Sequence, residues 1–202
     1  MSESTKTILN LIKTRRSIRR FSQKPISDEI LRQILDCARL APSSGNFQPL
    51  EYIAVTDENL RKQVFRNVMW AAHVDGKRNP PKGMRPTAYI VVLINENIKK
   101  DRHADAAAAI QNILLSAWHF GIGSCWLGST QREQIMQILN IPDNFHIESV
   151  VAVGYPEESP ILEELMSDCT NYYLDENDKL HVPKRKLADI SHFNGFGRAF
   201  KK

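Results

Sequence analysis

Apolar residues recur along this chain with two spacings, one typical of helices and one typical of strands. Recurrence every three or four positions predicts helices over residues 5–14, 28–41, 57–68 and 101–120, and a fifth helix from Thr130. Short apolar runs predict strands over residues 50–55, 88–94, 124–127 and 147–153. There is no internal repeat and no break in composition. We therefore expect residues 1–202 to form a single domain of the α/β or α+β class.

Three of the predicted helices carry recognisable features. Ser27 is placed to cap the second helix, because acidic residues follow it in the first turn, where carboxylates suit the helix dipole. The helix over 101–120 is apolar around most of its circumference, so we expect it to be central and almost entirely buried. Thr130 and Glu133 have the spacing of a capping box, which would open the fifth helix.

Two long segments lack periodicity. Glycines and prolines interrupt residues 70–86, which predicts a long surface loop of the kind that is usually functional or mobile. Residues 155–202 have weak periodicity and predict an extended tail that depends on a partner surface.

Composition and charge indicate which ligands and which cellular compartment to expect. Lys and Arg total 27 and Asp and Glu total 23, so the net charge of +4 favours an anionic ligand without establishing nucleic-acid binding. The apolar run 88–94 is far shorter than the roughly 20 residues of a membrane helix. Residues 1–13 lack the apolar segment of a secretory signal, so we expect a cytoplasmic protein with no membrane partner. Three cysteines without a C-x-x-C pair fit a reducing compartment, and the scattered histidines predict no metal site.

The chain shows no arrangement of catalytic side chains. The glycines at 121 and 123 leave a helix and enter a strand, the opposite of a dinucleotide-binding fingerprint. Cys125 is more easily explained as a buried apolar cysteine than as a nucleophile, because no histidine is placed beside it. If the protein is an enzyme, a cofactor is expected to supply the reactive atom.

Three segments could bind a ligand. Four arginines in the six residues 15–20, with Ser17 among them, match the donor density of a phosphate site, and a second basic set occupies residues 184–186. Both could instead be solvated charge runs, or could bind nucleic acid or another polyanion. The polar loop 41–49 could recognise a heterocycle edge or a sugar chain, or could be a plain turn between a helix and a strand.

Taken in order, several strings resemble the FMN-dependent nitroreductase family, over about residues 5–190. They are RRSIRRF at 15–21, APSSGNFQP at 41–49, QN at 111–112 leading to GIGSCWLG at 121–128, and PKRKL at 183–187. The resemblance implies an α+β fold in which a mainly antiparallel central sheet is flanked by helices in three layers. It also implies a homodimer with FMN at its interface, onto whose partner subunit the C-terminal tail extends.

The resemblance implies the following roles for the residues of this chain. Arg15 and Ser17 hold the FMN phosphate and ribityl chain with Arg16 beside them, and two of Lys184, Arg185 and Lys186 complete the phosphate site. Arg19 lies at the flavin N1/O2 edge, and Asn67 reads the pyrimidine edge. Pro42, Ser43, Ser44 and Asn46 come from the other subunit. Trp126, Leu127, Gly128 and Ser129 run along the isoalloxazine, with a backbone N–H near Gly128 facing N5.

The expected activity is electron transfer from NADH or NADPH, through flavin N5, to a nitroaromatic, quinone or similar small acceptor by a ping-pong mechanism. No side chain is expected to be catalytic in itself; the fixed charge of Arg19 would support the reduced flavin. Residues 70–86 would form the lid. A flavin-dependent dehalogenase or another specialised reductase is the alternative within the family, and a polyanion-binding protein is the alternative of another class.

Overall fold

The structure is a computed structural model that describes residues 7–70, 74 and 79–200. Its described residues belong to two compact units, one formed by 7–70 with 79–158 and the other by 74 with 159–200. None of the helices in these ranges is long and apolar enough to span a membrane.

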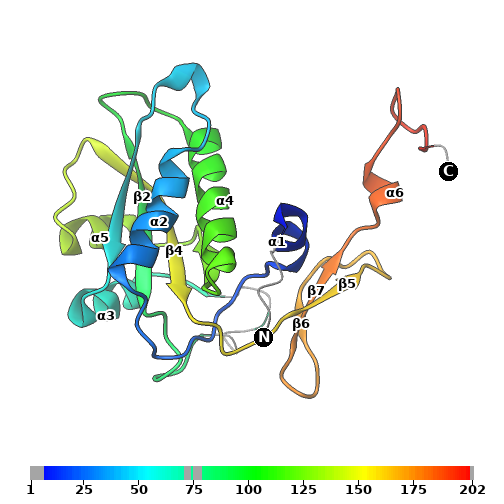
Figure 1. Cartoon of the computed structure of the whole chain (residues 1–202), viewed down its shortest axis with the longest axis horizontal. Coiled ribbons are helices and arrows are strands. Elements are labelled where there is room, and N and C mark those ends of the chain that lie inside the picture. Colours follow the sequence, from blue (N-terminus) through cyan, green and yellow to red (C-terminus); the bar gives the residue numbers. More distant parts are fainter. Residues whose placement is uncertain (1–6, 71–73, 75–78, 201–202) are drawn as a thin grey trace. The chain divides into compact units, whose positions relative to one another are not determined.

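A four-stranded antiparallel sheet forms the centre of the first unit (Figure 1). Its strands lie in the order β1 (Leu50–Val55), β2 (Ala88–Asn95), β4 (Phe145–Gly154) and β3 (Gly123–Leu127). Ile90 lies opposite Val151, and Cys125 lies opposite Ala152. β3 is therefore an edge strand of this sheet, with one side left for other segments of the chain.

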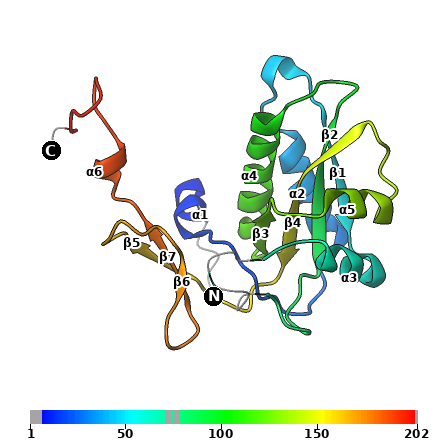
Figure 2. The same cartoon turned by 180° about the vertical axis from the view of Figure 1, so that it is seen from behind.

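Helices lie on both faces of the sheet (Figures 1 and 2). The main core cluster joins one face to α2 (Asp28–Arg39) and α4 (His103–His119), through side chains such as Ile34, Ile90, Ile113 and Val151. α3 (Glu58–Arg66) and α5 (Arg132–Ile138) lie on the other side. α1 (Ile8–Thr14) is joined to α4 by a hydrogen bond from the Trp118 indole N–H to Thr14 Oγ1, at 2.9 Å.

Most of the elements predicted for the first unit are confirmed. Ser27 caps α2 by accepting a hydrogen bond from the Ile30 N–H at 3.4 Å. The prediction that the long helix is almost entirely buried is correct only for its inner face, because Gln111 and His119 of α4 are exposed.

The predicted capping box at Thr130 is wrong. Thr130 pairs with Val68 in an isolated antiparallel bridge, and the Gln131 N–H donates to the Asn67 carbonyl at 2.8 Å. These backbone hydrogen bonds hold residue 130 in an extended segment, so α5 begins only at Arg132 and no side chain caps it.

A small three-stranded sheet forms the centre of the second unit. Its order is β5 (Ile161–Glu164), β7 (Leu180–Lys184), β6 (Tyr173–Leu174), with β5 parallel and β6 antiparallel to β7. A short helix, α6 (Leu187–Ile190), follows. Strands of two to five residues are too short for a periodicity to reveal them, which is why the sequence indicated only an extended tail.

Of the predicted lid, residues 71–73 and 75–78 lie outside the described residues. The remainder includes a turn in which the Met84 N–H donates to the Pro81 carbonyl at 2.9 Å.

Candidate functional site

The arginine-rich segment lies along the edge of the sheet, beside β3. The Ile18 N–H donates to the Ser124 carbonyl at 2.9 Å, and Ser17 pairs with Ser124 in a parallel bridge. The approach is close, since a Cβ atom at Gly123 would lie 2.8 Å from Ile18 Cγ1. Ile18 itself is fully buried. The apolar core therefore holds this segment in place, and the arginines on either side of Ile18 are fixed to the sheet edge.

Arg15 is a half-buried cation. Its guanidinium has no hydrogen bond or ion pair with any residue that the structure describes. Burial lowers the pKa of Arg15, and the charge of Arg16 lowers it further. A bound anion would remove both penalties, so the local electrostatics favour an oxyanion here.

Arg16 is turned toward α1. Its guanidinium donates to the carbonyl of Lys13 at 2.8 Å and to the carbonyl of Arg15. A cation at a helix C-terminus satisfies carbonyls that lack partners within the helix. In this structure Arg16 therefore stabilises the end of α1, and its predicted place beside the phosphate stays a prediction.

Arg19 lies near a buried thiol and a carboxylate. The backbone N–H groups of Arg19 and Arg20 both donate to Glu158 Oε1. Cys125 is 2% exposed, as predicted for a buried apolar cysteine. Burial raises the pKa of Cys125 despite the nearby Arg19 charge, so the thiol stays protonated. Arg19 thus brings a positive charge to the same sheet edge as Arg15.

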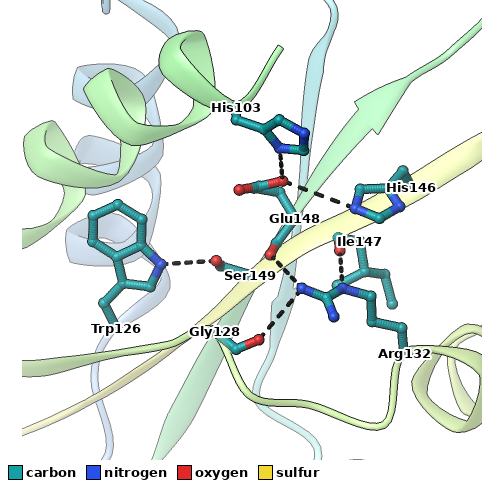
Figure 3. Close-up of polar contacts among 8 residues, drawn as sticks. All are labelled: His103, Trp126, Gly128, Arg132, His146, Ile147, Glu148 and Ser149. Carbon is teal, nitrogen blue, oxygen red and sulfur yellow. Dashed lines mark hydrogen bonds and ion pairs between the residues drawn. The ribbon is translucent and has the colours of Figure 1, made fainter. Parts of the chain in front are cut away.

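The end of β3 presents a mixture of buried and exposed positions. Leu127 is buried, whereas Gly128 and Ser129 are exposed. Trp126 is 39% exposed, and its indole N–H donates to Ser149 Oγ of β4 at 2.7 Å (Figure 3). The exposed backbone after Leu127 is where the predicted N–H facing N5 lies.

Arg132 holds this turn against β4, and the sequence analysis did not identify it. Its guanidinium donates to the Gly128 carbonyl at 3.3 Å, to the Ile147 carbonyl at 2.8 Å and to the Glu148 carbonyl at 3.3 Å (Figure 3). A cation in the first turn of a helix opposes the helix dipole. This unfavourable position is the feature of the sequence that could have indicated a structural role for Arg132.

Asn67 lies beside the same turn. The Met69 N–H donates to the Ser129 carbonyl at 3.0 Å, so the segment after α3 pairs with the segment after β3. The Asn67 side chain itself donates to the Gln63 carbonyl at 2.9 Å. The structure therefore brings Asn67 close to Ser129, with its amide N–H engaged at the end of α3.

The polar loop after α2 lies at the beginning of α4. The Ser43 hydroxyl donates to Asp105 Oδ2 at 2.7 Å, and the Ser44 N–H donates to Asp105 Oδ1 at 3.3 Å. Asp105 is 5% exposed and was not identified from the sequence. Asn46 has a φ of 52°, in the left-handed region that asparagine tolerates. This buried carboxylate shapes the loop, while Pro42, Ser44 and Asn46 stay exposed.

The loop and the arginine segment lie near opposite ends of α4. Asp105 is in its first turn, and Trp118, which bonds Thr14 next to Arg15, is in its last. Thirteen residues of helix at 1.5 Å each separate them by about 20 Å. One chain therefore does not bring these two predicted groups together.

The C-terminal basic residues belong to the second unit. Lys184, Arg185 and Lys186 are all exposed. Lys186 pairs with Glu164 at 3.5 Å, and Arg185 donates to the Asp189 carbonyl at 3.2 Å. Their convergence on the arginine segment stays a prediction.

Comparisons with known proteins identify the family of the chain. Residues 12–155 match the model of the nitroreductase family. The chain belongs to the nitroreductase family. It is 41% identical, over 74% of its own length and 86% of the relative's, to an Archaeoglobus fulgidus protein provisionally named NADH dehydrogenase/NAD(P)H nitroreductase.

Solved structures of this nitroreductase family share the fold. A family protein from Clostridium novyi NT has a TM-score of 0.66 at 27% identity, over 74% of this chain and 86% of that one. A Desulfovibrio desulfuricans protein, provisionally named a nitroreductase and solved in complex with FMN, has a TM-score of 0.65 at 28% identity, over 76% and 88%. The α+β fold with a mainly antiparallel sheet is thereby confirmed, and the chain is an oxidoreductase of this family.

Proposed function

We propose that this nitroreductase-family protein binds FMN, accepts electrons from NAD(P)H and passes them to a small acceptor in a ping-pong reaction. The observation that carries the proposal is the half-buried Arg15 guanidinium, which lacks a protein partner among the described residues and lies at the edge of the sheet. The FMN complex of the Desulfovibrio desulfuricans relative supports the choice of anion.

The residues at the sheet edge fit FMN. Arg15 and Ser17 would hold the phosphate and ribityl chain, because a guanidinium and a hydroxyl supply the donors that a phosphate accepts. Two of Lys184, Arg185 and Lys186 would complete the phosphate site. The bound FMN would supply hydride transfer at N5. Arg19 would place a fixed positive charge near the N1/O2 edge, where a preorganised cation stabilises negative charge better than water does.

The remaining residues position the ring. The backbone at Gly128 and Ser129, held against β4 by Arg132, would present an N–H toward N5. Trp126 and Leu127 would line the ring beside this turn, and Asn67 would approach its pyrimidine edge.

A homodimer would complete the site. Because the polar loop and the arginine segment lie near opposite ends of α4, a second copy running the other way would bring its loop, with Pro42–Asn46, to the arginines of the first. Exposed apolar side chains support such an interface: on α1, Ile8 is 66% and Leu9 64% exposed, and Met166 in the second unit is 85% exposed. The C-terminal tail would extend onto the partner.

Flavin binding and reduction of the purified protein test this function. Bound flavin is identified by its visible spectrum, and by its release when a sample is denatured. The FMN affinity is measured on folded apoprotein. Anaerobic reduction of the bound flavin is followed with NADH and with NADPH. Arg15→Gln should weaken FMN binding by about 10- to 100-fold, because a hydrogen bond to a charged group contributes about 1.5–3 kcal/mol. Arg32→Gln, on an exposed position of α2, is the matched control. A protein without flavin affinity, or equal affinity in both variants, contradicts the proposal.

A further inference from the structure

Part of the predicted lid, residues 82–86, lines a cavity in the first unit that contains none of the residues assigned to the flavin itself. The cavity has a volume of about 680 Å³ and lies between α3, the segment 82–86 and the start of β2. α3 lies on the side of the sheet opposite α2 and α4 (Figures 1 and 2). Cavities of this volume accommodate small organic ligands up to the size of a mononucleotide.

Positive side chains dominate the lining. Arg61, Lys62, Lys82 and Arg85 all line the cavity, against the single carboxylate of Glu58. Glu58 is already paired with Lys62, whose Nζ lies 2.6 Å from its Oε1. The other three cations therefore have no carboxylate of the lining left to neutralise them. Such a concentration of one charge raises the local concentration of ligands of the opposite charge.

Arg61 is held rigidly at the wall. Its Nε donates to the Thr56 carbonyl at 2.9 Å, and its Nη1 donates to the Pro86 carbonyl at 3.1 Å. Two bonds to backbone from separate segments fix the guanidinium plane. Arg61 is thus a preorganised charge, and a ligand would lose little side-chain entropy in meeting it.

Arg85 has no hydrogen-bond or ion-pair partner for its side chain within the described ranges. Its guanidinium carbon lies 3.9 Å from the centroid of the Phe65 ring, and its Nε is buried without a partner. Stacking on the aromatic face fixes the guanidinium plane and leaves its N–H edge available. That edge matches the two oxygens of a carboxylate or phosphate.

Tyr89 also lines the cavity. Its side chain is 1% exposed, and its hydroxyl lacks a hydrogen-bond partner among the residues described. Burial raises the pKa of Tyr89, and this effect outweighs the charges of Arg85 and Arg61, which lower it. The hydroxyl therefore keeps its proton and can donate a hydrogen bond. A buried hydroxyl without a partner costs stability, and a polar ligand atom would satisfy it.

We propose that this cavity binds a small organic oxyanion, with a carboxylate or phosphate group held between Arg85, Lys82 and Arg61 and an apolar body against Phe65. The site is separate from the proposed flavin site. A nucleotide phosphate and an aromatic carboxylate share the required chemistry and are the two sources that the experiment separates.

Calorimetric titration of the purified protein, saturated with FMN so that the flavin site is occupied, tests the proposal. The probes are adenosine 5′-monophosphate, benzoate and uncharged adenosine. At least one of the two anions should bind saturably, more weakly as salt is raised, while adenosine should not bind. Tighter binding of adenosine 5′-monophosphate identifies the ligand group as a nucleotide phosphate, and tighter binding of benzoate identifies it as an aromatic carboxylate. Absence of saturable binding by both anions, or equal binding of adenosine, overturns the proposal.

Four variants, one of them a control, locate the binding. Arg85→Gln should weaken the anion at least tenfold, whereas Arg32→Gln on α2 should leave it unchanged. Glu58→Gln should strengthen binding, because it releases Lys62 toward the cavity. If circular dichroism shows that Arg85→Gln does not fold, Lys82→Gln takes its place, because Lys82 is exposed. Lys82→Gln should lower the affinity for the anion about threefold. Equal affinity in the cavity variants and the control overturns the proposal.

Discussion

Adding one methyl group at Gly123 tests how the arginine segment is positioned. A Cβ atom at this position would lie 2.8 Å from Ile18 Cγ1, 2.9 Å from Cβ and 3.0 Å from Cγ2. The Ile18 side chain cannot easily turn aside, because it is fully buried. In Gly123→Ala the segment carrying Arg15 and Arg19 must therefore shift away from β3.

The magnitude follows from the packing. Inserting a methyl into a well-packed core costs about 1–3 kcal/mol in free energy of unfolding. Ile18→Ala removes Cγ1 and Cγ2, two of the three atoms that would clash, and should cost about 2–5 kcal/mol by itself. In the double variant the new methyl fills part of the space left by Ile18. The double variant should therefore be less destabilised than the sum of the two single variants, by about 1–2 kcal/mol.

The assay is urea unfolding of the four proteins of this cycle, followed by circular dichroism, together with FMN affinity. Gly123→Ala should also weaken FMN binding, because Arg15 and Ser17 move with Ile18. Free energies that add within about 0.5 kcal/mol would refute the close packing at Gly123. Unchanged flavin affinity in Gly123→Ala would refute the dependence of the flavin site on this packing.

Three other changes test separate parts of the structure. Asp105→Asn should destabilise the protein by about 1–3 kcal/mol in urea unfolding and weaken FMN binding, because the buried carboxylate orders the polar loop; equal stability contradicts this. The hydrogen bond to Glu163 raises the pKa of His181. The stability that the protonated ring gives the second unit should therefore be complete below pH 6.5 and lost as the pH rises through the raised pKa. A ring-proton NMR titration of His181 with a midpoint at or below 6.5 contradicts this. Arg132→Gln should leave the fold intact but change the reduction potential of bound flavin, because it frees the Gly128 turn; an unchanged potential removes this positioning role.

The fold of the first unit was largely predictable because its elements are long or strongly patterned. Strand β2 is an unbroken apolar run from Ala88 to Ile94, and Ser27 caps the start of α2 as its side chain indicates. The error at Thr130 has a different origin, because backbone pairing with Val68 depends on a segment far away in the sequence. Local patterns do not contain such pairings.

The candidate site was predictable only in part. The resemblance pointed to Arg15 and to the loop containing Ser43, but not to the groups that hold them in place. Asp105 and Arg132 act through hydrogen bonds that form only on folding, and neither belongs to a local motif. The separation along α4 likewise appears only in three dimensions, where the polar loop and the arginine segment lie near opposite ends of that helix.

The most direct test of a site shared between two copies is complementation between two variants. Arg15→Glu damages the arginine half, and Ser44→Trp damages the loop half, so neither protein alone should bind FMN. After the two are mixed and allowed to exchange subunits, half of the dimers are mixed, and each of these has one site built from two intact halves. The account predicts that about a quarter of the flavin sites return. No recovery from a mixture shown to exchange, or normal binding by either variant alone, would contradict it.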